Sequence, residues 1–200
     1  MHDWLLLIYS LPSQPSRRRA YVWRELKKLG ALYLRDGVAL LPRRPDLLAH
    51  LDALTERIDR EEGNSYLVVD PPFAGSHGDD FVKRFNDERA AEYGEIYHSG
   101  VRFLRDVLED VDRDDFGFPD VDNLESELGR LVRWLDQVKG RDYFSSPMAQ
   151  KAEEILAKCE TAFERFVSEA SEREEGPAAR EDVFDRLAGS AGSPPDDYPL

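Results

Sequence analysis

The segment that decides the fold of the N-terminal half is residues 31–42, ALYLRDGVALLP. Two short apolar runs flank Asp36-Gly37, and Pro42 closes the second of them. An Asp-Gly pair between apolar runs is among the strongest local signals for a β-hairpin, because a type I′ turn needs a positive φ at both central residues. The sequence therefore predicts a type I′ hairpin with strands over 31–35 and 38–41.

One further strand and one further helix are expected on each side of this hairpin. Before it, the continuous apolar run 4–9 is typical of a strand buried on both faces, and 16–29 has helical periodicity with Ser16 placed to cap its start. After it, leucines at helical spacing predict a helix over 45–62, and 65–69 is the last strand. The order strand–helix–strand–strand–helix–strand is the split βαβ, or ferredoxin-like, arrangement.

The remainder of the chain shows helical periodicity only. Three amphipathic helices with short connections, the third beginning near Pro147, predict a small antiparallel three-helix bundle. The last residues are acidic and then rich in Gly, Ser and Pro, which is typical of a disordered tail. We therefore expect an α+β protein with a ferredoxin-like βαββαβ region over 1–75, a helical region over 76–170 and a disordered acidic tail over 171–200.

Charge is unevenly distributed along the sequence. The chain has 27 Lys and Arg against 41 Asp and Glu, a net charge of −14, yet residues 1–75 hold 11 basic and 10 acidic residues. Such an acidic chain is repelled by anionic lipid and does not bind nucleic acid over its whole surface, so an anion needs a local basic patch. No apolar run approaches the roughly 18 residues of a membrane span, and no signal peptide is evident. We expect a cytoplasmic protein without membrane partners.

The strongest candidate site is the first helix, whose predicted start carries three consecutive arginines. Backbone N–H groups and the helix dipole favour an anion at a helix start, whereas clustered like charges there lower stability. Further basic residues and one tyrosine follow at i+4, i+7 and i+11 from the first arginine, giving one exposed stripe suited to a phosphate backbone or an oxyanion. The alternative is a solvated helix face partnered by Glu25 or by the acidic second half. The candidate binding residues are Arg17, Arg18, Arg19, Tyr21, Arg24 and Lys28.

Three further arginines form a secondary set. Arg43 and Arg44 follow the hairpin and could extend the basic patch, although a polar loop is the simpler interpretation. Arg141 opens the segment 141–144 between two predicted helices. That segment could contact a ligand, but an ion-paired corner fits a short helix–helix connection better.

No motif of a catalytic or metal site is present in the sequence. There is no glycine-rich phosphate loop and no G-x-S-x-G. The single cysteine, Cys159, excludes an internal disulfide, and its apolar neighbours at helical spacing favour a core role over a redox role. The four histidines share no spacing with it that predicts a zinc site or a nucleophile pair. We expect no cofactor, no metal and no catalysis.

Three stretches of this sequence resemble the N-terminal region of the ChrB family of chromate-resistance regulators. They are 4–12, 36–42, and 23–31 together with the arginines at 17–19. A looser similarity continues through Phe85, Arg89, Tyr93 and 141–144. The resemblance implies a cytoplasmic protein that controls or senses expression of a chromate-efflux operon, with promoter DNA and chromate or another oxyanion as partners. Full-length members usually carry a second, C-terminal domain. This chain ends without one, so we expect a standalone N-terminal domain and a separate ChrB C-terminal-domain protein as a further partner.

The same pattern is also similar to the C-terminal part of the phenylacetate-pathway repressor PaaX and to the nuclease-like proteins of CRISPR adaptation. Those nucleases place an aspartate at the end of the first strand to hold a metal between two subunits. Here that position reads Ile8-Tyr9-Ser10, and a serine hydroxyl supplies no charge for Mg²⁺, which prefers carboxylate oxygens. Nuclease activity is therefore not expected.

Two hypotheses of function follow from the sequence. The first is a non-enzymatic regulatory protein that binds DNA, an oxyanion signal, or both, through the basic helix. Because ferredoxin-like halves often pair through their sheets or edge strands, we expect a homodimer, which would double the basic patch. The alternative is an acidic protein-interaction module that does not bind nucleic acid and whose arginines only offset its charge.

Overall fold

The computed structural model describes residues 3–73, 77–114 and 116–174. Its elements follow one another in the order that the sequence predicts. Strands and helices alternate in the N-terminal part, and only helices follow. They are β1 (Trp4–Ser10), α1 (Ser16–Lys28), β2 (Leu32–Arg35), β3 (Val38–Pro42), α2 (Pro45–Arg60), β4 (Asn64–Val69), α3 (His77–Asp112), α4 (Phe118–Lys139) and α5 (Ala149–Glu174).

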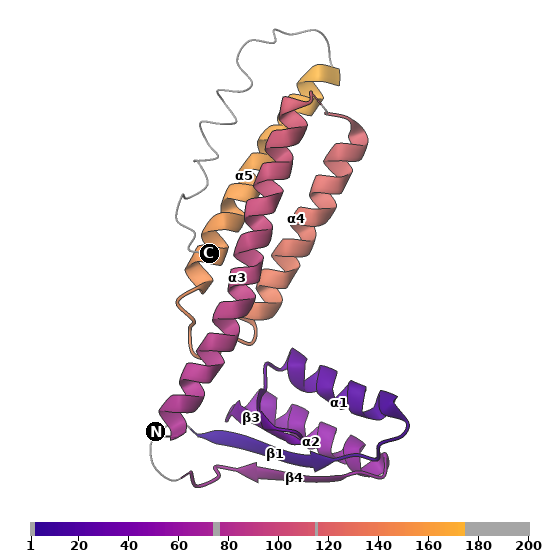
Figure 1. The fold of residues 1–200 in the computed structure, drawn as a ribbon, viewed down its shortest axis with the longest axis vertical. Coiled ribbons are helices and arrows are strands. Elements are labelled where there is room, and N and C mark those ends of the chain that lie inside the picture. The colour runs from indigo at the N-terminus through magenta and orange to yellow at the C-terminus, as the bar shows by residue number, and fades with distance from the viewer. Residues whose placement is uncertain (1–2, 74–76, 115, 175–200) are drawn as a thin grey trace. The chain divides into compact units, whose positions relative to one another are not determined.

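The four strands form one sheet in the order β2-β3-β1-β4, with every neighbouring pair antiparallel. Strand β1 lies inside the sheet, where Leu6 pairs with Leu40 on one side and with Val68 on the other. Helices α1 and α2 cover one face of the sheet (Figure 1). This is the ferredoxin-like topology, so the predicted α+β fold is confirmed.

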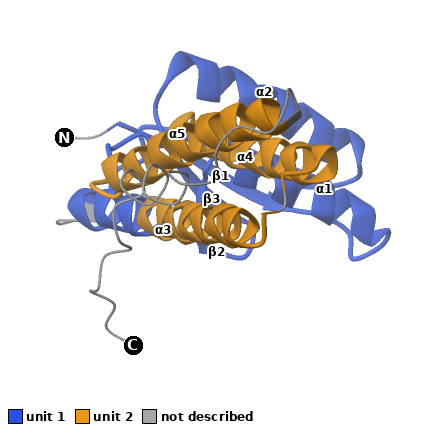
Figure 2. Ribbon diagram, turned by 90° about the horizontal axis from the view of Figure 1, so that it is seen from above, with its two compact units in different colours: residues 1–88, 141–145 blue, residues 89–140, 146–200 orange. Residues whose placement is uncertain are grey.

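The chain divides into two compact units, coloured separately in Figure 2. The first unit contains residues 1–88 and 141–145, and the second contains residues 89–140 and 146–200. The first unit thus includes the sheet, α1, α2, the opening turns of α3 and the short connection that follows α4.

In the first unit, the face of the sheet beneath α1 and α2 is closed by aliphatic side chains. Alternate residues of β1 point to this face, since successive side chains of a strand point to opposite sides. They meet the apolar stripe of each helix, and together these side chains anchor α1 against the sheet. The buried residues of this core include Leu5, Leu7, Val22, Leu26, Ala39, Leu41, Leu47, Leu51, Leu54 and Ile58.

The opposite face of the sheet carries an aromatic cluster. Trp4 stacks on Phe85 of α3, with ring centroids 5.8 Å apart, and meets Phe81 edge to face at 5.7 Å. Phe144 packs on Trp4 and Phe85, and the neighbouring Tyr143 hydroxyl donates a hydrogen bond to the Leu29 carbonyl oxygen at 2.7 Å. The segment 141–144 therefore contributes two aromatic side chains to the core of the first unit.

In the second unit, α4 runs antiparallel to α3 and α5, and the three helices enclose a core of their own (Figure 1). The fully buried positions recur at the helical spacing that the sequence shows. They include Tyr93, Ile96, Phe103, Leu131, Val138, Ala152, Cys159 and Phe166. Among the described residues, no helix combines the length and the apolar composition that a membrane crossing requires.

Cys159 belongs to this second core. Its side chain is fully buried, and its thiol donates a hydrogen bond to the Gly100 carbonyl oxygen at 3.3 Å. Burial raises the pKa of the Cys159 thiol to about 12, so the reactive thiolate is scarce at neutral pH.

We therefore expect iodoacetamide at pH 8 to leave the folded protein unmodified. The same reagent should add one label per chain in denaturant, because unfolding exposes the thiol and restores its ordinary pKa. Mass spectrometry of the two samples measures this difference. Rapid labelling of the native protein would mean that Cys159 is accessible and that its burial is wrongly described.

Four local predictions differ from the structure. Ser16 is the first residue of α1 rather than its cap; Pro15 holds the cap position, and no side chain caps the helix. In the hairpin, Gly37 has φ +72° but Asp36 has no positive φ, and the ladder shifts by one residue between Tyr33 and Arg35. The reversal at Asp36-Gly37 is therefore not a type I′ turn, and a one-residue bulge accompanies it in the ladder between β2 and β3.

The other two differences concern α5. This helix begins at Ala149 rather than near Pro147, because Ser146 and Pro147 lie in the turn that precedes it. It continues to Glu174, past the predicted start of the tail at residue 171. The rest of the predicted disordered tail, 175–200, lies outside the described residues.

Candidate anion-binding site

Helix α1 is the most basic element of the chain. Its 13 residues, SRRRAYVWRELKK, include six Arg or Lys and one acidic residue, Glu25, and its first turn has no acidic residue. Only Val22 and Leu26 are fully buried, so the helix is fixed to the sheet along one narrow stripe. The basic side chains of its remaining surface are exposed or half-buried.

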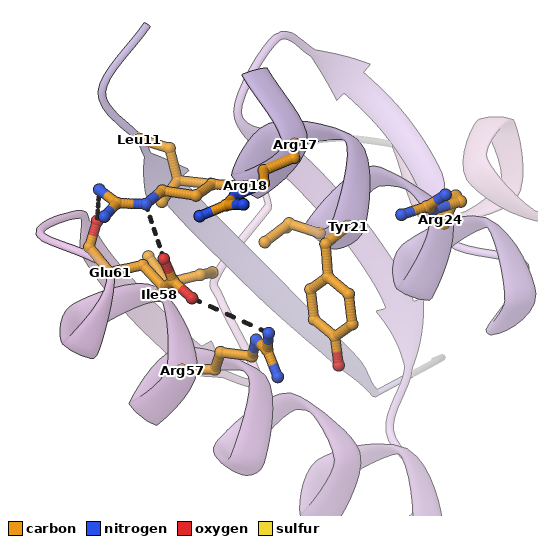
Figure 3. A pocket seen from close by; sticks show the side chains of 9 residues that line it. Leu11, Arg17, Arg18, Tyr21, Arg24, Arg57, Ile58 and Glu61 are labelled. Atoms are coloured by element: carbon orange, nitrogen blue, oxygen red, sulfur yellow. Dashed lines mark hydrogen bonds and ion pairs between the residues drawn. The ribbon is translucent and has the colours of Figure 1, made fainter. Parts of the chain in front are cut away.

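A pocket of about 350 Å³ lies between the N-terminal part of α1 and the C-terminal part of α2 (Figure 3). It combines four guanidinium groups, one carboxylate and one tyrosine over an aliphatic floor. Its lining residues are Leu11, Arg17, Arg18, Tyr21, Val22, Arg24, Arg57, Ile58 and Glu61. The structure thus places four of the six predicted binding residues around one concave surface.

Glu61 is the acidic group of the pocket, and it lies between two of the arginines (Figure 3). Its carboxylate is 2.7 Å from Arg18 Nε and 3.8 Å from Arg57 Nη2. Arg18 also donates a hydrogen bond to the Glu61 carbonyl oxygen at 3.1 Å and approaches Glu62 at 3.3 Å. These contacts hold the Arg18 side chain, which is only 24% exposed, against the end of α2.

Arg57 lies over the ring of Tyr21, with its guanidinium carbon 4.0 Å from the ring centroid. A cation at this distance from an aromatic face is attracted by the ring quadrupole. Tyr21 therefore positions one cation of α2 beside the cations of α1, and the two helices share the charged wall of the pocket.

Arg17 and Arg24 differ from the other two arginines of the pocket. Both are exposed, and neither has an acidic partner among the described residues. No hydrogen bond from either guanidinium group to another described residue is seen, so these donors can bind a ligand. With four guanidinium groups against one carboxylate, the pocket is a positively charged concavity within an acidic protein.

The other two predicted residues of α1 do not line this pocket. Arg19 donates a hydrogen bond to the Ser13 carbonyl oxygen at 3.1 Å, and Lys28 pairs with Glu25 at 2.8 Å. Arg57 and Glu61 are pocket residues that were absent from the sequence-based set. Arg57 lies in the last turn of α2 and Glu61 directly follows the helix, so their spacing is that of an ordinary i, i+4 surface pair. Only the packing of α2 beside α1 brings them to Arg18.

The secondary arginines lie away from the pocket. Arg43 pairs with Asp70, and Arg44 pairs with Asp46 at 3.2 Å and lies 5.4 Å from the Tyr143 ring centroid. Arg141 belongs to the segment that carries Tyr143 and Phe144 into the first unit. None of these three arginines is among the lining residues.

The chemistry available at the pocket is anion binding. Guanidinium groups donate paired, charge-assisted hydrogen bonds to the oxygens of phosphate-like anions, and Arg is suited to this geometry. In the described part of the chain, no three or more His, Cys, Asp or Glu side chains come together in a way that could hold a metal ion.

Comparison with known proteins gives two related matches. Residues 19–176 match the family described as "Protein ChrB, N-terminal". The chain is also similar to "Protein ChrB" of Cupriavidus metallidurans, with 30% identity over 151 residues. That alignment covers 75% of this chain and 43% of the relative, so the chain spans less than half of the relative's length. The family match includes most of α1 and all of α2, the two helices that line the pocket.

Proposed function

Because the chain belongs to the ChrB N-terminal family, we propose that it is a non-enzymatic regulatory protein of chromate resistance that binds an oxyanion through α1. The bound group is a tetrahedral oxyanion, either free in solution, as in chromate, or as a phosphate of promoter DNA. Arg17 and Arg24 are its principal ligands, and Arg18, Arg57 and Tyr21 complete the site.

One observation carries this proposal: four guanidinium groups line a single concave surface, and two of them lack an acidic partner in the described residues. Gathering like charges in a fold is unfavourable unless a counter-charge is supplied. Glu61 supplies one such charge to Arg18 and Arg57. A bound dianion would supply the remainder for Arg17 and Arg24.

Two titrations test the proposal and separate the two sources of the oxyanion. Calorimetry with chromate, sulfate and phosphate measures binding of the free anion. Fluorescence anisotropy with a labelled duplex from the promoter upstream of this gene measures DNA binding, whose affinity should fall steeply with salt. Binding of at least one of these ligands is expected. If neither a free oxyanion nor the duplex binds at low salt, the proposal is wrong. Recovery of a stoichiometric protein partner, whose binding chromate and DNA do not change, would then support the interaction-module hypothesis.

Glu61→Gln should strengthen anion binding. The carboxylate is 33% exposed and competes with a ligand for Arg18 and Arg57, so its neutralisation leaves both cations available. We expect an affinity for sulfate or chromate roughly 3- to 10-fold higher, a range typical of removing one partly solvated charge pair. Calorimetry measures the change.

Glu56→Gln is the matched control for this substitution. Glu56 is an exposed glutamate of α2, the helix that ends just before Glu61. It does not line the pocket, and its replacement changes the net charge equally. Equal gains in both variants would mean that only net charge matters. A loss of affinity in the Glu61 variant would mean that Glu61 orders the site rather than competes for it.

We also propose that the protein acts as a homodimer, as expected from its ferredoxin-like half. Strand β4 is an edge of the sheet, and Tyr66 on it is 68% exposed beside Ile8, which is 38% exposed. Exposed apolar residues next to an unpaired strand edge favour pairing with a second sheet. Sedimentation equilibrium tests the dimer; a monomer across the micromolar range would contradict it.

A further inference from the structure

The pocket between α1 and α2 is much larger than a single tetrahedral oxyanion. Its volume is about 350 Å³. An ion such as sulfate or phosphate displaces roughly two or three water molecules, each of about 30 Å³. Pockets that hold small organic ligands begin at about 300 Å³. Most of the space in this pocket therefore stays open when an oxyanion alone is bound.

The floor of the pocket is aliphatic. Val22 and Ile58 are buried, and Leu11 is partly buried beside them. All three side chains belong to the core beneath α1 and α2, so the floor is fixed before a ligand binds. A hydrated anion gains nothing from aliphatic surface, whereas an apolar group that covers this surface is removed from water. The floor thus favours a ligand that carries an apolar part as well as a charge.

The polar side chains of the pocket are mostly hydrogen-bond donors. Arg17 precedes Tyr21 by four residues and Arg24 follows it by three, so the tyrosine lies between two cations on one side of α1 (Figure 3). Among the described lining side chains, only the Tyr21 hydroxyl and the Glu61 carboxylate can accept a hydrogen bond, and Glu61 already binds Arg18. A molecule rich in hydroxyl groups needs acceptors as well as donors. An aromatic body suits this lining better than a polyhydroxylated one.

We propose that this pocket binds the phosphate ester of a small organic molecule with an aromatic body, of about the size of a mononucleotide. This inference rests on the proposed function and names the class of molecule that carries the tetrahedral group. The phosphate oxygens bind Arg17 and Arg24, and the organic body packs on the aliphatic floor beside Tyr21. Free sulfate or chromate occupies the phosphate position alone and therefore competes with the ester.

Calorimetry with a matched series of ligands tests this inference. Adenosine monophosphate and phenyl phosphate are the probes, and inorganic phosphate, ribose 5-phosphate and adenosine are the references. Both probes should bind about tenfold more tightly than inorganic phosphate, because burial of roughly 60 Å² of apolar surface corresponds to that factor. Sulfate should displace them. Ribose 5-phosphate should bind like inorganic phosphate, and adenosine should bind more weakly than its monophosphate because it lacks the charge.

Leu11→Ala should remove part of the gain that the organic body provides. We expect the affinity for the two probes to fall about 3- to 10-fold and the affinity for inorganic phosphate to stay the same, since only the organic body contacts this side chain. Leu48→Ala is the matched control, because Leu48 is a partly buried leucine of the same core that does not line the pocket. Equal losses in both variants would mean that the floor makes no specific contact, and they would overturn the inference.

The ligand series also separates this inference from the proposed function. If sulfate or inorganic phosphate binds and the probes bind no more tightly, the inference is wrong and the oxyanion site stands. Adenosine that binds as tightly as its monophosphate would overturn the inference too, because the arginines would then not anchor the ligand. If no free anion and no organic phosphate binds, the inference fails, and the titration with the promoter duplex decides whether the proposed function fails with it.

Discussion

Replacing Arg17 and Arg24 with alanine should weaken sulfate or chromate binding about 10- to 100-fold. A solvent-exposed hydrogen bond contributes about 0.5–1.5 kcal/mol net, so the loss of two such contacts corresponds to roughly this range. The two arginines are the pocket cations that no acid of the described chain neutralises. Both side chains are exposed, so their removal breaks no internal ion pair seen in the structure and should leave the stability of the fold almost unchanged. Calorimetry measures the affinity, and thermal unfolding checks the stability.

The control must remove the same charge from elsewhere in the protein. Arg60 lies on α2 without lining the pocket, and Arg105 lies on α3; both are exposed. The variant that carries Arg60→Ala and Arg105→Ala therefore loses two positive charges without altering the pocket. If both double variants lose affinity to the same extent, the anion responds to net charge and the pocket is not the site.

Gly37→Ala should produce the largest loss of stability among single substitutions of the hairpin. Gly37 has φ +72°, a conformation that L side chains rarely adopt, and an added Cβ would overlap the Tyr9 carbonyl oxygen. The same segment forms a hydrogen bond from Tyr9 N–H to the Gly37 carbonyl oxygen at 2.7 Å, so the backbone cannot retreat without losing this bond between β1 and the hairpin. We expect the free energy of unfolding to fall by about 2–4 kcal/mol.

Urea denaturation followed by tryptophan fluorescence measures this loss. Gly94→Ala is the matched control, because a Cβ at Gly94 meets nothing within 4 Å and the residue lies inside α3. There the substitution should be neutral or stabilise by up to about 1 kcal/mol, since alanine favours a helix. Equal stability of the two variants would contradict the conformation described for the hairpin.

The topology could be predicted from the sequence because each element of the N-terminal half has its own local signals. These signals act over a few residues, and the structure confirms the element that each predicts. They are the apolar run of β1, the leucine spacing of α2 and the chain reversal at Asp36-Gly37. The type of turn could not be predicted in the same way. A bulge between Tyr33 and Arg35 accompanies a positive φ at Gly37 but not at Asp36, and such a bulge depends on how β2 pairs with β3.

The candidate site could be predicted only in part. Helical periodicity is sufficient to put Arg17, Tyr21 and Arg24 on one side of α1. The contribution of Arg57 and Glu61 follows from how α2 packs beside α1 through Ile58, which is a tertiary contact with no local signature. Arg43 shows the converse. Its position after the hairpin is compatible with a polar loop or with an extension of the basic patch, and its ion pair with Asp70 depends on how β4 ends.

The central claim is that the space between α1 and α2 binds a tetrahedral oxyanion, and an NMR titration of the ¹⁵N-labelled protein with sulfate tests it most directly. Saturable shifts should appear at the backbone and guanidinium signals of Arg17, Arg18, Arg24 and Arg57, and they should be absent from α4 and α5. Chromate should compete for the same signals. Small shifts that do not saturate and spread over all exposed arginines would contradict the claim.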